Sequence, residues 1–354
     1  YPTIVLHTYY LIQYNDYIKN ITGGGMQMKT QSKKRKIIRT VLLVILLLLI
    51  VAAGGFISVY ESRFQTISSI QKVTDYDEYN LYRMDVKYDY DLDRLIEYGI
   101  TDNQSFVDAI VKEALPILPV HIKAPDFGCS AFTLQEADGN VLMGRNYDFK
   151  RDTSAMLVYC EPKDGYKSVA FAALDNISAN IPDASMKKKL ATLTAPFICL
   201  DGMNEKGVSI AVLTLDSEPV HQNTGRPVIG TTLVIRLILD RAATTEEAVE
   251  LLNQYDMFAT SGRDYHFYIT DASGGRVVEY DCESETREMV ATPIRSITNF
   301  FGLYRDKVLP NQKNGIYGHG KERYDKMEAI FDYEEVYTSD VAWEALKAAS
   351  QEPS

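Results

Sequence analysis

Residues 126–149 read DFGCSAFTLQEADGNVLMGRNYDF, and the rest of the chain is organised around this stretch. Apolar runs on either side of a D-G dipeptide predict two antiparallel strands joined by a tight turn. The first strand begins near Cys129, and the second ends at the cluster Arg145, Asn146 and Asp148. A thiol, a guanidinium and a carboxylate therefore come into one neighbourhood. We interpret Cys129 as a candidate catalytic nucleophile.

Downstream of this hairpin, the sequence predicts more antiparallel strands with helices beside them. Three hairpins and two helices are expected, over residues 155–174, 197–215, 266–281, 230–242 and 245–255. Strand pairs covered by outer helices are typical of a layered α+β domain. The simplest account is a single domain that starts at Cys129.

The N-terminal part of the chain carries a membrane signal. Residues 1–60 contain seven Lys and Arg against one Asp, which gives them a net charge of +6. Because the whole chain has a net charge of −11, the remaining residues carry −17. Residues 41–59 hold no charge, and about 20 apolar residues span a bilayer. Because the basic residues come first, we expect the N-terminus in the cytoplasm and the body outside the cell. A cleaved signal peptide is the alternative, and it leads to a secreted body.

These features divide the chain into four parts. Residues 1–36 form a cytoplasmic tail, and residues 37–60 form a transmembrane anchor or signal sequence. Residues 61–128 form a lead segment, and residues 129–354 form the layered domain. In the tail, three glycines directly precede two methionines, so we expect that residues 1–25 are not translated natively. A short disordered tail is the alternative for these residues.

The lead segment has helical spacing of apolar residues in LDRLIEYGI and in SFVDAIVKEALPIL. We expect Asn103 or Ser105 to cap the second helix. The segment is either a small helical subdomain or a propeptide that packs over the site, and we favour the propeptide.

Composition excludes several classes of function. The acidic body argues against a nucleic-acid partner, because phosphate binding needs a basic face. The four cysteines are widely spaced, which does not fit a zinc site or a disulfide scaffold, and no cofactor is expected. Cys160, Cys199 and Cys282 lie in strand-like runs and read as buried apolar residues. The residues alone do not decide whether Cys129 is catalytic. The alternative is that Arg145 and Asp148 form a structural ion pair.

Five motifs in collinear order carry a family resemblance. They are C-S-A-F, G-R-N-Y-D-F, D-G-M-N-E-K-G-V, S-I-T-N and G-K-E-R-Y, and they run from Cys129 to about Met327. Together they resemble the choloylglycine hydrolase family, which includes bile-salt hydrolases and penicillin V acylases among the N-terminal nucleophile hydrolases. The resemblance implies a four-layer αββα sandwich with antiparallel sheets. It also implies hydrolysis of a linear, non-peptide amide bond.

The resemblance assigns roles to five residues. Cys129 matches the nucleophile, and Arg145 and Asp148 match the pair beside it. Asn299 matches the asparagine that points its amide at the oxyanion, and Arg323 matches a second active-site arginine. Without the resemblance, Asn299 would be read as a turn residue and Arg323 as a solvated residue at a helix start.

Several positions depart from the pattern of bile-salt hydrolases. Thr214 stands where those enzymes have an asparagine, which puts bile-salt preference in doubt. We still expect Thr214 and Asn146 beside the substrate or the oxyanion, whereas Asn204 is expected to be only a turn residue. The family continues with more strands after the last helix, here near residues 339–350. The sequence is therefore expected to be truncated at its C-terminus, with an open sheet edge.

The implied mechanism requires an N-terminal cysteine whose free α-amine serves as the base. More than 100 residues precede Cys129, as in acid-ceramidase-like relatives with a propeptide. We therefore expect autocatalytic cleavage between Gly128 and Cys129, followed by hydrolysis of a small N-acyl amide.

Other functions remain open at this point. In the same fold, the substrate could be an N-acyl amino acid, an N-acyl homoserine lactone or a ceramide-type lipid. A non-catalytic, membrane-anchored binding protein is a second alternative. A papain-like protease is disfavoured, because His221, His266 and His319 lack a recognisable flanking signature. The oligomeric state is not determined by the sequence.

Overall fold

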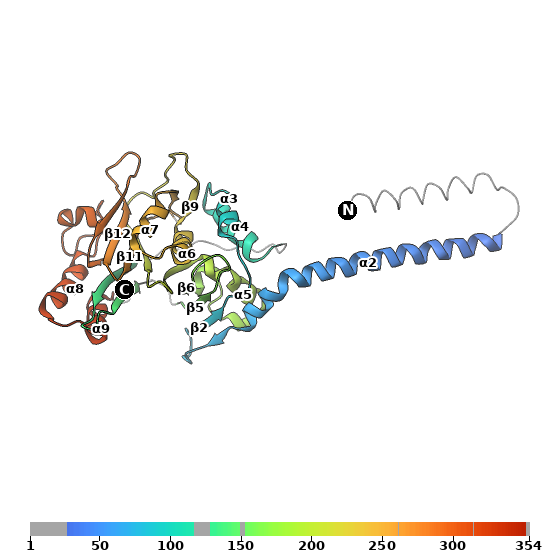
Figure 1. Ribbon diagram of the computed structural model, residues 1–354, viewed down its shortest axis with the longest axis horizontal. Helices are drawn as coiled ribbons and strands as arrows, with labels where there is room; N and C mark the ends of the chain where they lie inside the picture. The colour runs from blue at the N-terminus through green and yellow to red at the C-terminus, as the bar shows by residue number, and fades with distance from the viewer. Residues whose placement is uncertain (1–26, 117–127, 149–152, 261, 314, 352–354) are drawn as a thin grey trace. The chain divides into compact units, whose positions relative to one another are not determined.

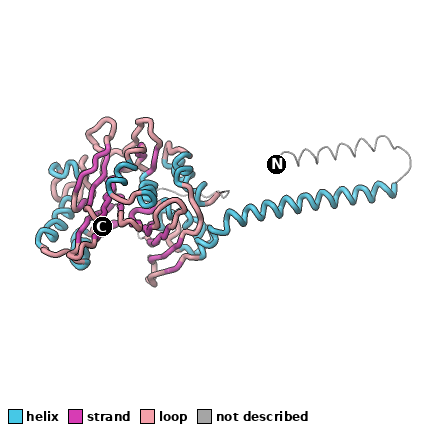
Figure 2. The backbone as a smooth tube through the Cα atoms, viewed as in Figure 1, coloured by secondary structure: helices cyan, strands magenta, loops and turns pink. Residues whose placement is uncertain are grey.

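A computed structural model of the chain describes residues 27–116, 128–148, 153–260, 262–313 and 315–351. The chain divides into two compact units, Tyr1–Glu61 and Ser62–Ser354. The first unit contains most of one long helix. The second contains the strands and the other described helices (Figures 1 and 2).

The described elements are one long helix, seven shorter α-helices, fourteen strands and four 3₁₀ helices. The helices are α2 (Gln27–Ser68), α3 (Leu92–Glu97), α4 (Asn103–Ala114), α5 (Met186–Ala191), α6 (Thr231–Arg241), α7 (Thr245–Leu252), α8 (Lys321–Tyr333) and α9 (Ser339–Ala349). The strands are β1 (Gln71–Lys72), β2 (Leu81–Asp85), β3 (Gly128–Gln135), β4 (Val141–Asp148), β5 (Ala155–Cys160), β6 (Ser168–Ala173), β7 (Cys199–Asn204), β8 (Ser209–Leu215), β9 (Val228–Gly230), β10 (Asp256–Phe258), β11 (Asp264–Asp271), β12 (Gly274–Tyr280), β13 (Met289–Pro293) and β14 (Ser296–Ile297). Short 3₁₀ helices are η1 (Leu174–Ile177), η2 (Pro182–Ala184), η3 (Thr192–Phe197) and η4 (Gly302–Lys307).

The four hairpins predicted from the sequence are confirmed as β3–β4, β5–β6, β7–β8 and β11–β12, all antiparallel. Most of these strands join one large sheet of nine strands, in the order β1-β2-β5-β6-β7-β8-β11-β12-β13. Its neighbours pair antiparallel, except that β2 and β5 are parallel. A smaller sheet has the order β14-β3-β4.

The two sheets and their helices form four layers. Helices α6 and α7 pack on the outer face of the large sheet, over β7, β8, β11 and β12. Strand β3 of the small sheet packs on the inner face of β8, β11 and β12. Helices α8 and α9 then cover the outer face of the small sheet through β14 and β4 (Figure 1). The mixed α+β fold with antiparallel sheets is confirmed, in the expected order helix, sheet, sheet, helix.

Alternation along β3 explains how the small sheet joins two cores. Successive residues of a strand point to opposite faces. Ala131 belongs to the main core between the sheets, whereas Phe132 and Leu134 pack against α8 and α9. The rings of Phe132 and Phe331 lie 5.0 Å apart between centroids. The face of β3 that carries Ala131 is therefore the one turned toward the large sheet.

The described part of the lead segment is built into the second unit. Strand β2 extends the large sheet, and Tyr82 and Met84 on it are buried in the main core. The prediction that Asn103 or Ser105 caps α4 is wrong, because the cap is Asp102. Its carboxylate accepts from the Ser105 backbone N–H, and the Ser105 side chain accepts from the Asp102 backbone N–H. This reciprocal capping box satisfies two backbone donors that the helix leaves open.

Helix α2 is described on its own, as most of it belongs to the first unit. Its part Arg35–Ser68 is long and apolar enough to cross a membrane, and a signal sequence would have the same character. The uncharged run at residues 41–59 lies within it and is exposed almost throughout. Residues 1–26, including the glycine run expected to be untranslated, lie outside the described residues.

The role of β2 in the core can be tested by truncating Met84. This side chain is fully buried, so Met84→Ala should lower the free energy of unfolding by about 2–5 kcal/mol through lost burial and a cavity. Val73, 54% exposed in the same segment, provides the control, since Val73→Ala should change it by no more than about 0.5 kcal/mol. Denaturation of the full chain in detergent, followed by circular dichroism, measures both. Equal effects of the two substitutions would contradict the packing of β2.

Candidate active site

The register of β3 and β4 fixes the backbone of the site. Cys129 lies directly opposite Tyr147, Ala131 lies opposite Arg145, and Gly128 lies opposite Asp148. The Cys129 side chain itself is outside the part of the chain that the structure describes, as are residues 117–127 before the hairpin. The pairing nevertheless brings the backbone of Cys129 close to the strand that carries Arg145 and Asp148.

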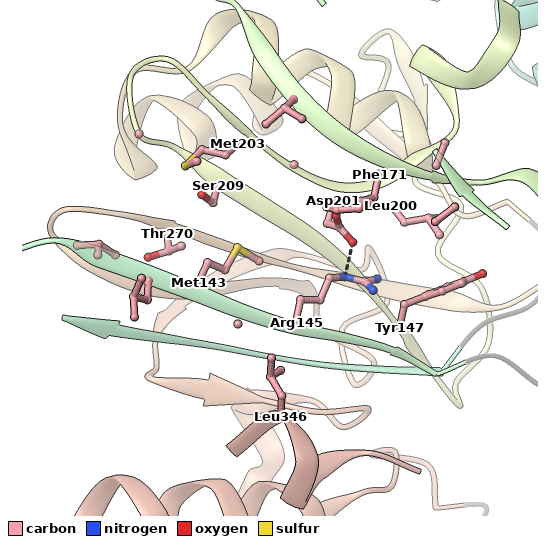
Figure 3. A pocket seen from close by; sticks show the side chains of 18 of the residues that line it. Met143, Arg145, Tyr147, Phe171, Leu200, Asp201, Met203, Ser209, Thr270 and Leu346 are labelled. Carbon is pink, nitrogen blue, oxygen red and sulfur yellow. Dashed lines mark ion pairs between the residues drawn. The ribbon is translucent and has the colours of Figure 1, made fainter. Parts of the chain in front are cut away.

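Arg145 reaches across the space between the sheets. Its Nε atom lies 3.0 Å from Oδ2 of Asp201 on β7, and its Nη2 donates to the Val212 carbonyl on β8 over 2.8 Å. The side chain is only 8% exposed, and its guanidinium lies over the Tyr147 ring at 5.3 Å from the centroid. Figure 3 shows the ion pair with Asp201 joining the two sheets. Arg145 is thus held rigidly from the opposite sheet.

Asp201 is the partner that sequence reasoning missed. It is the first residue of the D-G-M-N-E-K-G-V motif, so the motif contained the signal, but its position opposite Arg145 depends on how the sheets stack. Burial raises the pKa of the Asp201 carboxyl, and the Arg145 guanidinium partly offsets that increase.

Asn299 and Thr214, which are both expected near the oxyanion, contact each other. Both side chains are buried. Asn299 Nδ2 donates to the backbone carbonyl of Thr214 over 2.9 Å and lies 3.2 Å from its hydroxyl. Asn299 follows β14 and Thr214 lies on β8, so this contact links the small sheet to the large one. Asn299 is therefore more than a turn residue.

Arg323 connects Asn299 to Asp148. This arginine, on the first turns of α8, is buried rather than solvated. Its Nη2 donates to Asn299 Oδ1 over 2.6 Å, and its Nη1 lies 3.6 Å from Asp148 Oδ2. Burial raises the pKa of the Asp148 carboxyl, although Arg323, the Gln351 backbone N–H and Arg145 act to lower it. Four of the predicted site residues thus form one buried chain of contacts, from Asp148 through Arg323 and Asn299 to Thr214.

Two glycines let the loop before α8 approach Asn299. At Gly318, φ is +99°, and a Cβ atom would lie 2.2 Å from the Asn299 carbonyl oxygen. At Gly320, φ is +86°, and a Cβ atom would lie 2.5 Å from Nη2 of Arg323. Between them, the His319 backbone N–H donates to the Asn299 carbonyl over 2.8 Å. Only glycine permits both the left-handed backbone and the close packing at these positions.

Two other asparagines contact neighbouring helices. Asn146 is paired with Ser130, on the face of β4 away from Arg145, and its side chain donates to the Leu346 carbonyl of α9 over 2.7 Å. Asn204 accepts from backbone N–H groups within its own turn and donates to the Ala242 carbonyl after α6 over 2.7 Å. The prediction that Asn204 is a structural turn residue agrees with these bonds.

A cavity of about 840 Å³ lies between β4 and the large sheet. Arg145, Tyr147 and Asp201 line it, together with an apolar wall that includes Met143, Val169, Phe171, Leu200 and Met203. In Figure 3, Met143 and Arg145 extend from β4 into the space faced by Asp201 and Met203. Phe171 and Met203 are 43% and 49% exposed, so large apolar surfaces are available to a ligand there. This volume is typical of small-molecule sites.

The other three cysteines are unsuited to nucleophilic chemistry. Burial raises the pKa of the Cys160 and Cys282 thiols to about 11, and that of Cys199 further. Since the thiolate is the nucleophile, these side chains remain unreactive near neutral pH. Among the described residues, no group of three or more His, Cys, Asp or Glu side chains could hold a metal ion.

Comparison with known proteins identifies the segment that carries most of the site. Residues 129–299 match the model of the linear amide C-N hydrolases, choloylglycine hydrolase family. The resemblance inferred from the motifs is thereby confirmed. The choloylglycine hydrolase match begins at Cys129 and ends at Asn299, and Arg323 lies beyond it. The matched family supports an amidohydrolase activity.

Solved structures similar to this chain include two kinds of enzyme. A mutant of conjugated bile acid hydrolase from Clostridium perfringens has a TM-score of 0.45 and 15% identity, over 62% of this chain and 78% of that chain. Penicillin V acylase from Agrobacterium tumefaciens has a TM-score of 0.42 and 18% identity, over 62% of this chain and 72% of that chain. Comparison with curated proteins gives no match.

The partly buried carboxyl of Asp201 should affect how the stability of the protein depends on pH. Because its pKa is raised, the folded protein keeps this proton to a higher pH than the unfolded chain, whose Asp pKa is about 3.9. Its contribution is fully present below that value and is lost as the pH rises through the raised pKa. Asp201→Asn cannot ionise. The free energy of unfolding of this variant, relative to wild type, should therefore increase as the pH rises from about 4 to about 7.

Urea denaturation at a series of pH values measures this change, and Asp271 provides a control whose pKa is shifted in the opposite direction. Burial acts to raise its pKa, but hydrogen bonds from Ser273 and Thr245 outweigh burial and lower it. Asp271→Asn should therefore lose stability relative to wild type as the pH rises over the acid range. A shift of the same sign in both variants would contradict the account of Asp201.

Proposed function

We propose that the protein hydrolyses a linear amide bond of an N-acyl substrate, with Cys129 as an N-terminal nucleophile. The observation that carries this proposal is the coincidence of two findings. The choloylglycine hydrolase match starts at Cys129. The matched candidate residues Asp148 and Asn299 are far apart in sequence, and Arg323 contacts both of them.

Electrostatics support Cys129 as the nucleophile. Its register position, opposite Tyr147, belongs to the face of the hairpin that carries Arg145. A nearby guanidinium favours the thiolate form of a cysteine. The other three cysteines have raised pKa values, so they do not compete for this role.

Cleavage between Gly128 and Cys129 would supply the base. The Cys129 thiol attacks the Gly128 carbonyl carbon, the peptide C–N bond breaks, and the nitrogen takes up a proton to become the α-amine. Water then hydrolyses the resulting thioester and releases Gly128 as a carboxylate. The free α-amine can next accept the proton of its own thiol, as in other N-terminal nucleophiles.

Turnover would follow the same chemistry on an external amide. The thiolate attacks the substrate carbonyl, and the α-ammonium returns its proton to the departing amine. Water hydrolyses the acyl-thioester and restores the thiol. The Asn299 side chain accepts from Arg323 through Oδ1 and donates to the Thr214 carbonyl through Nδ2, so its amide is held in a fixed orientation that suits a donor to the oxyanion. Removing such a donor typically lowers kcat by about 10²–10³-fold.

The cavity favours an extended apolar acyl group. Apolar side chains of both sheets line it, and Arg145 and Tyr147 at the cavity wall are the neighbours of Cys129 in the hairpin register. Each methylene buried there would add up to about 0.8 kcal/mol to binding. Long-chain N-acyl amides, including N-acyl amino acids, are therefore better candidates than bile salts. The absence of the bile-salt asparagine, where Thr214 stands, points the same way.

The proposed location is the outer face of a membrane. Basic residues before the apolar run in α2 favour a cytoplasmic N-terminus. Cleavage after Gly128 would not release the catalytic fragment, because β2 of the lead segment is hydrogen-bonded to β5 and its Met84 is buried in the core. The lead segment would then act as a retained anchor.

Substitution of Cys129 in the full chain tests the activity. The substrates are amides of one amine with increasing acyl length, together with penicillin V and glycine-conjugated bile salts. Wild type should hydrolyse the long-chain amides with the highest kcat/KM, Cys129→Ala should show no turnover, and Cys129→Ser should retain at most slow processing. Cys282→Ala, which removes a partly exposed thiol elsewhere, should match wild type.

The same assay can contradict the proposal. Turnover that survives Cys129→Ala would exclude this nucleophile. A folded wild-type chain that cleaves none of the amides and keeps Gly128–Cys129 intact would instead support a non-catalytic binding protein.

A further inference from the structure

A buried polar pair lies behind Asn299 and takes no part in the proposed chemistry. His266 on β11 and Glu279 on β12 are both 0% exposed. The His266 Nδ1 atom lies 3.4 Å from Glu279 Oε2. The two residues lie on adjacent strands near one end of the large sheet, where β12 is next to the terminal strand β13. Polar groups buried without compensation cost about 1–3 kcal/mol each, so the partners of this pair are informative.

His266 holds the residue immediately before Asn299. Its Nε2 lies 3.0 Å from the backbone carbonyl oxygen of Thr298. Because a carbonyl oxygen can only accept, Nε2 is the donor in this hydrogen bond. The Thr298 side chain is itself fixed by a hydrogen bond from its hydroxyl to the Gly320 carbonyl over 2.9 Å. The backbone just before Asn299 is thus bonded to strand β11 of the large sheet.

Glu279 holds the residues that follow Asn299. Its Oε2 accepts from the Gly302 backbone N–H over 2.9 Å, and its Oε1 accepts from the Leu303 backbone N–H over 2.6 Å. These two groups lie at the start of η4, where helical N–H groups lack partners within the helix. A carboxylate bound to backbone N–H groups makes stronger hydrogen bonds than a neutral acceptor.

Together, the two side chains clamp residues 298–303 at both ends. Asn299 lies inside this segment, and its own side chain is oriented by Arg323 and Thr214. An oxyanion donor must be held in position before the reaction, because its contribution depends on a geometry that does not relax at the transition state. The buried pair supplies that constraint on the backbone.

We infer that His266 and Glu279 are positioning residues that fix the backbone of Asn299 for oxyanion stabilisation. This inference rests on the proposed function for its catalytic consequence, while the clamp itself is a property of the fold. Neither residue contacts the reacting atoms in this assignment. They act through the Thr298 carbonyl and the N–H groups of Gly302 and Leu303.

Three substitutions in the full chain separate the clamp from general stability. His266→Leu removes the donor to Thr298, and His266→Gln retains a side-chain N–H donor. Glu279→Gln keeps the shape of the side chain but replaces one acceptor oxygen with a donor group facing backbone N–H groups.

Glu113→Gln is the matched control. Glu113 is also a buried glutamate that accepts a backbone N–H, from Asp91, but it lies in the lead segment. Its substitution perturbs this hydrogen bond and the ion pair of Glu113 with Arg94, far along the chain from Asn299.

Hydrogen exchange measured by mass spectrometry reads the clamp without reference to activity. Peptides covering residues 298–303 should exchange about tenfold faster or more in His266→Leu and Glu279→Gln than in wild type. His266→Gln should lie between, and Glu113→Gln should leave these peptides unchanged. With the long-chain amide, His266→Leu and Glu279→Gln should lower kcat by about tenfold or more with little change in KM. The reason is that the oxyanion develops only in the transition state.

The outcomes distinguish this inference from the proposed function. Unchanged exchange at residues 298–303 in a folded Glu279→Gln variant would overturn the clamp, whatever the activity. Faster exchange with unchanged kcat, in an enzyme that Asn299→Ala inactivates, would overturn its positioning role. A wild type without amidase activity would sink the proposed function, and the exchange data alone would then decide whether the clamp exists.

Discussion

The antiparallel register of β3 and β4 is the constraint on which the site depends. It aligns Cys129 with Tyr147 and Ala131 with Arg145, so a one-residue slip would exchange the faces of the hairpin. The register is secured from both sides. Ala131 packs in the core between the sheets, and Phe132 packs against Phe331 of α8. The same alternation that buries the hairpin on two faces therefore directs Arg145 toward the large sheet.

The second requirement is that polar groups of distant segments meet in a largely buried place. Asp148, Arg323, Asn299 and Thr214 come from β4, α8, the end of β14 and β8. Each is held by at least one partner in the chain, which offsets the cost of burying it. Arg145 repeats this arrangement with Asp201. Such a network leaves side chains few alternative positions, which suits preorganised catalysis.

The sequence predicted the hairpins and the helices α6, α7 and α9, because these depend on local periodicity and turn residues. The layer order was implied only by the family resemblance. It did not predict that β2 pairs in parallel with β5, since that contact joins segments about 75 residues apart through no local signal. The family resemblance assigned roles to Asn299, Arg323 and Asp148, but their contacts with one another were not predicted. Asp201 and His266 were missed because their partners depend on how strands stack and pair, which hydrophobic patterns do not specify.

N-terminal sequencing of the catalytic fragment, purified from membranes that express the full chain, tests the central claim most directly. The account predicts a fragment that begins Cys-Ser-Ala-Phe at Cys129 and remains bound to a separate fragment containing α2. An unprocessed chain with intact Gly128–Cys129 that hydrolyses N-acyl amides would contradict it, because the α-amine of Cys129 would then not exist.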